Sequence, residues 1–183
     1  MFGQIPIPNE IELLANLTNL NLSNVGFVGQ IPIGLAKLTN LVWLDLSSLS
    51  FNELPQLQLT NPNFETVIGN LSNLRALYPD GVNISANGHQ WCATVARLTP
   101  KLKVLSLSSC SITGPINSSL AELPNLSVLR LDQNELNSSV PKAFVTLPSL
   151  SEILMRRFRS LILINRKCTF IRCSTSWSIH RDR

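Results

Sequence analysis

The feature that most constrains this 183-residue chain is a set of leucines that recurs every 24 residues. Leu20 matches Leu44 in the next unit, and Leu105 matches Leu129 in a later pair of units. Within a unit the spacing is LxxLxLxxN/CxL, and the alternation in LxL is typical of a short strand with one buried face. A period of this length predicts an array of small coils. Each coil is too thin to bury a core alone, so neighbouring coils must stack.

Five units keep this register, and they cover residues 15–32, 37–52, 70–85, 101–116 and 123–141. Partial units occupy 3–6 and the stretch from 147. Two intervals exceed the period, one before Leu71 and one before Leu102, and we expect both to bulge from the coil as loops. Pro79 replaces the second strand leucine of its unit. Because proline has no N–H to donate, we expect a weakened rung of the strand ladder there.

The spacing is that of leucine-rich repeats and predicts an α/β solenoid: a curved right-handed superhelix with short parallel strands on its concave face and an irregular or 3-10 convex side. The period is lost after Ile153, so we expect a repeat domain over 1–153 and a basic, non-repeat tail over 154–183. The tail is either disordered or a gene-model artefact. It has a net charge of +7 against −3 for 1–153, so the basic pI gives no argument for nucleic-acid binding.

Cys110 lies in the middle of a unit, at the position that Asn134 holds 24 residues later. Leucine-rich repeats accept either residue there, with the side chain turned into the coil. A catalytic thiol instead needs an accessible, electropositive setting. We therefore expect structural roles for Cys110 and Asn134.

No catalytic residue, metal site or cofactor is expected. His89 and Cys92 have the spacing of half a metal site, but a zinc site needs more ligands than these two. The alternative is a packed Trp-Cys pair that anchors the inserted loop. A disulfide between Cys92 and Cys110 is a further alternative that the sequence does not decide. The motifs of hydrolases, kinases and phosphate-binding loops are missing from the sequence, so we expect no enzyme.

The strand register also predicts which side chains point outward from the concave face. The candidate ligand-binding residues on these rows are Trp43, Asp45, Tyr78, Asp80, Ser106, Arg130 and Asp132. Tyrosine, tryptophan and arginine are enriched at the energetic centres of interfaces, and solenoids use such faces for binding. The alternative is that these are ordinary solvated positions.

Three phrases carry a resemblance to a known family: DGVNISANGHQWC, LSLSSCSITGPINSSLAELPNLSVLRLDQNELNSSVP and LPQLQLTNPNFETVIGNLSNLRAL. They resemble ectodomains of plant receptor-like proteins of the Verticillium wilt resistance type. The resemblance implies a cell-surface receptor in defence or development signalling, on the extracellular side of the plasma membrane. It also implies a peptide, protein or glycan ligand and a partner receptor kinase as co-receptor, and it implies no nucleic acid.

Asn-x-Ser/Thr sequons are dense in the repeat region, which fits a secreted parent protein. The glycosylation candidates are Asn16, Asn70, Asn83, Asn117, Asn125 and Asn137. Asn21 also begins a sequon, but a glycan there would obstruct the concave face. The alternative is that Asn and Ser are simply frequent in repeat turns.

Two other functions compete with the receptor: a secreted inhibitor of a pathogen wall-degrading enzyme and a truncated, non-functional product. The truncation hypothesis rests on the expectation that this chain lacks a signal peptide, a membrane span and capping segments. Bare apolar coil ends would then make the isolated chain aggregate. Size-exclusion chromatography and thermal denaturation test this expectation, and a monomer with a cooperative melt would contradict it.

Overall fold

A seven-stranded parallel sheet runs the length of the computed structural model, which describes residues 5–48, 56–86, 88–136, 141–155 and 170–172. Its order follows the chain: β1 (Asn19–Asn21), β3 (Trp43–Asp45), β5 (Ala76–Tyr78), β6 (Val104–Ser106), β8 (Val128–Arg130), β10 (Glu152–Leu154) and β11 (Phe170–Arg172). The matching repeat leucines are register partners, as in Leu20 with Leu44 and Leu105 with Leu129. The predicted solenoid is confirmed.

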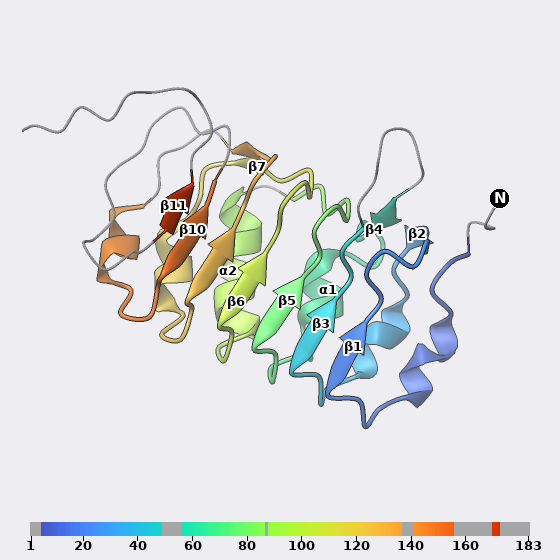
Figure 1. The fold of residues 1–183 in the computed structure, drawn as a ribbon. Coiled ribbons are helices and arrows are strands. Elements are labelled where there is room, and N and C mark those ends of the chain that lie inside the picture. The colour runs from blue at the N-terminus through green and yellow to red at the C-terminus, as the bar shows by residue number, and fades with distance from the viewer. Residues whose placement is uncertain (1–4, 49–55, 87, 137–140, 156–169, 173–183) are drawn as a thin grey trace, which may run out of the picture.

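Short helices cover the other side of this sheet (Figure 1). Four are 3-10 helices: η1 (Asn9–Leu13), η2 (Ile33–Lys37), η3 (Ser118–Glu122) and η4 (Lys142–Thr146). Two are α-helices, α1 (Phe64–Ile68) and α2 (Gly88–Leu98). Helices need about 10 Å of lateral space and strands only about 4.8 Å, so a stack of this kind curves with the sheet on its concave side.

The predicted boundary at residue 153 falls within β10. The backbone of β11 comes from the segment that the sequence assigns to a non-repeat tail, and it extends the sheet by one strand. Residues 156–169 and 173–183 lie outside the described part of the chain, so the domain boundary stays a prediction.

The described parts of the two longer intervals pack against the coils and do not bulge from them as predicted, whereas residues 49–55 and 87 lie outside the described part of the chain. In the first interval, Leu57 and Leu59 are buried in the core, and β4 (Leu57–Gln58) pairs with β2 (Gly29–Gln30). The second interval contains α2, which buries Trp91, Cys92 and Val95 against the solenoid. Both segments carry apolar side chains that gain more from burial than from a loop conformation. A second short parallel pair joins β7 (Thr113–Gly114) to β9 (Glu135–Leu136).

The repeat leucines form one continuous core through the stacked coils. Leu41, Leu44 and Leu46 of a single coil are each at most 1% exposed. Burial of one such side chain is worth about 1.5–3 kcal/mol, and most of it occurs against the neighbouring coils. In the first coil, by contrast, Leu13 is 77% and Val25 62% exposed.

Pro79 interrupts the ladder between β5 and β6, as the sequence predicts. Leu46 N and Leu107 N, at the matching positions of other coils, donate to the carbonyls of Tyr78 and Arg130. Pro79 has no N–H for the equivalent bond, and β5 and β6 pair over two residues where β3 and β5 pair over three.

Asn134 closes the turn between two coils from the inside. Its Oδ1 accepts from the backbone N–H groups of Cys110 (3.0 Å) and Ile112 (3.2 Å). Its Nδ2 donates to the carbonyls of Leu107, Leu131 and Asp132 at 2.6–3.1 Å. One amide side chain therefore bonds five backbone groups of two neighbouring coils.

Gly81 sits where only glycine fits, because its φ is +77° and an added Cβ would lie 2.0 Å from the Ser48 carbonyl oxygen. Gly26 has a similar φ of +85° but open space around it. We expect Gly26→Ala to lower the free energy of unfolding by about 1–2 kcal/mol through backbone strain alone. Gly81→Ala should cost about 3–4 kcal/mol, since the Ser48 backbone must also move. Urea denaturation measures both, and equal losses would contradict this account.

Removal of the Asn134 amide should destabilise the turns that follow β6 and β8. We expect Asn134→Ala to lower the free energy of unfolding by about 2–4 kcal/mol, because buried N–H and carbonyl groups lose their partners. Asn125→Ala, at an exposed position of the same coil, is the matched control with an expected loss below about 0.5 kcal/mol. Hydrogen exchange of the Cys110 and Ile112 amides should accelerate only in Asn134→Ala. Unchanged protection there would disprove the role.

Candidate functional site

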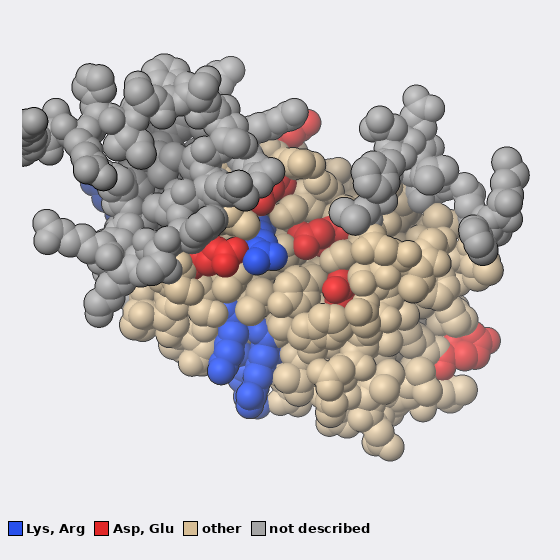
Figure 2. All heavy atoms as spheres, in the orientation of Figure 1, with Lys and Arg blue, Asp and Glu red and all other residues tan. Residues whose placement is uncertain are grey.

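The sheet side of the solenoid presents two rows of outward side chains, one on each side of the buried middle residue of strands β1, β3, β5, β6, β8 and β10. The register joins Asn19 to Trp43, Ala76, Val104 and Val128 in the first row. The second row joins Asn21 to Asp45 and Tyr78, and Ser106 to Arg130. Asp80, Ser108 and Asp132 follow the strands at the same edge. Figure 2 shows this concave face.

Trp43 and Tyr78 are in contact on this face. Their ring centroids lie 5.7 Å apart, with the planes tilted by 53°. The register partner of Trp43 is Ala76 on β5. The small side chain of Ala76 leaves room for the Trp43 indole to reach Tyr78, which also belongs to β5. Both rings are half-buried, so each keeps part of its surface open to solvent. Tilted aromatic pairs at this distance are favourable and hold both rings in place.

Two carboxylates lie beside this aromatic pair. Asp45 is the register partner of Tyr78, and its Oδ1 accepts from the Ser47 N–H at 2.9 Å. Oδ1 of Asp80 accepts from the Ser106 hydroxyl (2.8 Å) and the Ser108 N–H (2.6 Å). Burial raises the pKa of Asp80, the bonds from Ser106 and Ser108 oppose this rise, and the charge of Asp45 adds a little to it.

Ser106 belongs to the outward row but is only 1% exposed. It orients Asp80 and has almost no surface of its own to offer a ligand. Arg130 is half-buried, and its Nε lies 3.0 Å from Oε1 of Glu152 on the next strand. Glu152 was not among the predicted site residues. The repeat could have predicted it, because Glu152 follows the outward residue Val128 by one period of 24 residues and is its register partner.

Charge is unevenly distributed over the concave face. Acidic side chains and a single basic group occupy its middle, and long basic side chains gather at the lower edge (Figure 2). In the sequence, exposed Arg75, Lys101 and Lys103 come just before β5 and β6, whereas Asp45 and Asp80 come at the carboxyl ends of β3 and β5. The carboxylates near the aromatic pair therefore lie at the opposite edge from these cations.

Both described cysteines are free, buried thiols. Burial raises the pKa of Cys92 to about 12, and burial followed by the charge of Asp80 raises the pKa of Cys110 well above its usual range. Cys110 Sγ donates to the Pro79 carbonyl at 3.1 Å, and Cys92 Sγ accepts from the Asn117 N–H at 3.3 Å. Neither environment favours the thiolate that nucleophilic or metal chemistry needs.

The described residues contain no group of three or more His, Cys, Asp or Glu that could hold a metal ion. The side chain of His89, together with Cys168 and Cys173, lies outside the described residues. None of the helices in the described segments is both long and apolar enough for a membrane span.

The predicted glycosylation sites differ in accessibility. Asn16, Asn70 and Asn125 are exposed. Asn83 accepts a short hydrogen bond from the Ser85 hydroxyl, and Asn117 caps η3 by accepting from the Ser119 N–H at 3.0 Å. Asn137 lies outside the described residues. Geometry therefore favours the first three as acceptors.

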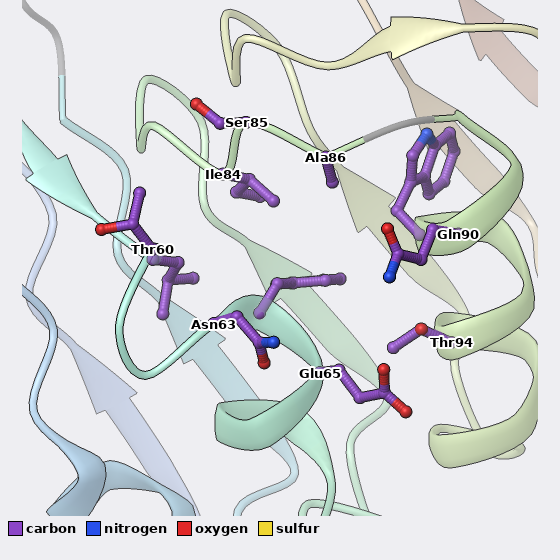
Figure 3. Close-up of a pocket in the computed structure, with 11 residues that line it drawn as sticks. Thr60, Asn63, Glu65, Ile84, Ser85, Ala86, Gln90 and Thr94 are labelled. Carbon is purple, nitrogen blue, oxygen red and sulfur yellow. The ribbon is translucent and has the colours of Figure 1, made fainter.

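A pocket of about 270 Å³ that sequence reasoning missed lies on the convex side, between α1 and α2 (Figure 3). Asn63, Glu65, Gln90 and Thr94 border it, and Phe64 and Trp91 belong to its apolar lining. Glu65 forms an ion pair with Arg97 at 2.5 Å. The pocket lies where the α-helices α1 and α2 stand in place of the 3-10 helices of the other coils.

Comparison with known proteins agrees with this geometry. Leucine-rich-repeat family models match residues 16–38 and 100–157. Receptor-like protein 6 of Arabidopsis thaliana is 37% identical over 148 residues, which are 76% of this chain and 14% of that protein. The chain spans 13–16% of the length of the curated relatives it matches.

Two solved plant ectodomains share the fold. That of the Arabidopsis thaliana receptor kinase GASSHO1/SCHENGEN3 has a TM-score of 0.67 at 28% identity, over 82% of this chain and 17% of its own. The Arabidopsis receptor kinase HAESA, in complex with the peptide hormone IDA and the co-receptor SERK1, has a TM-score of 0.65 at 26% identity, over 82% and 24%. This chain belongs to the leucine-rich-repeat proteins, and its repeats are of the plant receptor-like type.

Proposed function

We propose that this chain is a ligand-recognition module of a plant cell-surface receptor-like protein, acting in defence or development signalling on the extracellular side of the plasma membrane. The observation that carries the proposal is the concave face, where half-buried aromatic and charged side chains stand on a rigid sheet. Rigid aromatic and arginine side chains are the groups that dominate binding energy at protein interfaces.

The ligand is a peptide, a protein or a glycan, and a receptor kinase is the co-receptor. HAESA, a neighbour of the same fold, was solved with a peptide hormone and a co-receptor, which supports a peptide in the first place. Only 14% of the residues in the sequence are charged. Glycans on Asn16, Asn70 and Asn125 would cover part of a surface with few charged side chains. No reaction is required for this function.

A phage-displayed peptide library, selected on the immobilised chain, tests this proposal. We expect selected peptides to bind at least tenfold more weakly to the Val104→Gln/Val128→Gln variant, because two larger side chains obstruct the centre of the concave face. Both valines are half-buried outward residues, so the fold should tolerate the change.

The matched control places the same residue at exposed convex positions, in Ala93→Gln/Ser118→Gln. This variant should bind the selected peptides within twofold of the unmodified chain. Peptides that bind both variants equally well, or a selection that yields no binders, would reject the concave face as the recognition surface.

A further inference from the structure

Four side chains stand together along β3 and β5 and just beyond β5: Trp43, Asp45, Tyr78 and Asp80, which we call the acidic-aromatic patch. Trp43 and Tyr78 touch each other, and Asp45 is the register partner of Tyr78. Asp80 lies two residues beyond Tyr78, close enough for the charge of Asp45 to affect its pKa. All four are half-buried, so the patch is accessible from the concave side.

Among the described residues, no ion pair neutralises the two carboxylates of the patch. The ion pairs among the described residues are Lys37 with Glu12, Arg97 with Glu65, and Arg130 with Glu152, so none involves Asp45 or Asp80. Arg130, a basic residue of the outward rows, is engaged by Glu152. The cations Arg75 and Lys103 come just before β5 and β6, at the opposite end of the strands from Asp45 and Asp80.

Hydrogen bonds hold both carboxylates in place. The Ser47 N–H donates to Oδ1 of Asp45, the Ser106 hydroxyl and the Ser108 N–H donate to Oδ1 of Asp80, and the Ser108 side chain adds a further bond to Asp80. These bonds fix both carboxylates in orientation, so little rotamer freedom is lost when a ligand binds. Burial, with a smaller effect from Asp45, raises the pKa of Asp80, so a nearby positive charge would relieve an unfavourable ionisation.

A carboxylate beside an aromatic face is the chemistry that recognises an organic cation. A guanidinium or ammonium group within about 6 Å of an indole or phenol ring gains cation–π energy, and a carboxylate adds charge-assisted hydrogen bonds. A metal ion fits less well, because the described residues hold no group of three or more acidic, His or Cys ligands. The six strand intervals of the sheet span roughly 29 Å, the length of about nine extended residues.

We propose that the acidic-aromatic patch binds the arginine or lysine side chain of an extended peptide that lies across the concave face. This inference rests on the proposed function, since it names the chemistry of the ligand recognised there. The cationic side chain lies against Trp43 and Tyr78 and forms an ion pair with Asp45 and Asp80.

The test uses the synthetic peptide acetyl-GSGSRSGSG-amide and a counterpart with citrulline in place of arginine, which keeps the shape and removes the charge. The reporter is the indole N–H resonance of Trp43 in ¹H–¹⁵N NMR spectra, assigned through Trp43→Phe. We expect the arginine peptide to shift this resonance saturably, and the citrulline peptide to bind at least tenfold more weakly.

Three variants separate a local site from diffuse charge attraction. Asp45→Asn and Asp80→Asn keep an oxygen for the serine hydrogen bonds but remove the charge, and each should weaken the arginine peptide at least fivefold. Glu122→Gln removes an equal charge from an exposed position of η3, on the convex side, and should change affinity by less than twofold. Thermal denaturation confirms that each variant folds.

Equal binding of the citrulline peptide, or an equal loss in Glu122→Gln, would overturn the inference. The inference would also be overturned if the arginine peptide did not bind while the binding of library peptides still depended on Val104 and Val128. That last result would leave concave-face recognition intact. Failure of both the arginine peptide and the library would reject the proposed function as well.

Discussion

Each coil of this chain buries its leucines only against the coils on either side, and every other feature of the structure depends on that stacking. Leu44 and Leu105 are completely buried although each belongs to a three-residue strand. The parallel ladder holds neighbouring coils in register, and a shift by one residue would turn the leucines out to solvent. The positions of the side chains on the concave face are therefore fixed by the core beneath them.

The stacking of coils explains how the acidic-aromatic patch forms from residues far apart in the chain. Trp43 and Asp45 come from one coil and Tyr78 and Asp80 from the next, across an interval longer than the regular period. The strands nevertheless stay in register, with Leu44 opposite Leu77. Serines from the following coil then orient Asp80. A concave sheet with such fixed side chains suits recognition of an extended ligand.

The sequence predicted the strands, the buried leucines and the outward rows correctly, because alternation in a strand needs only local spacing. It also predicted the weak rung at Pro79 from the missing N–H. It expected a loop instead of α2, because the contacts of this helix with η3 and α1 are not encoded in a local pattern. The packed Trp91–Cys92 pair was nonetheless among its alternatives, and both side chains are buried. It also could not foresee that Ser106, in an outward position, is covered and bonded to Asp80.

The sequence by itself determined the repeat, its register and the face on which each strand residue lies, because these follow from a fixed period of apolar side chains. Tertiary structure alone decided which outward residues meet. It brought Trp43 onto Tyr78 across Ala76, engaged Arg130 with Glu152 and left Asp45 and Asp80 outside the ion pairs of the described residues. The physical reason is that such contacts depend on the lateral stacking of coils and on rotamers, which period and composition do not specify.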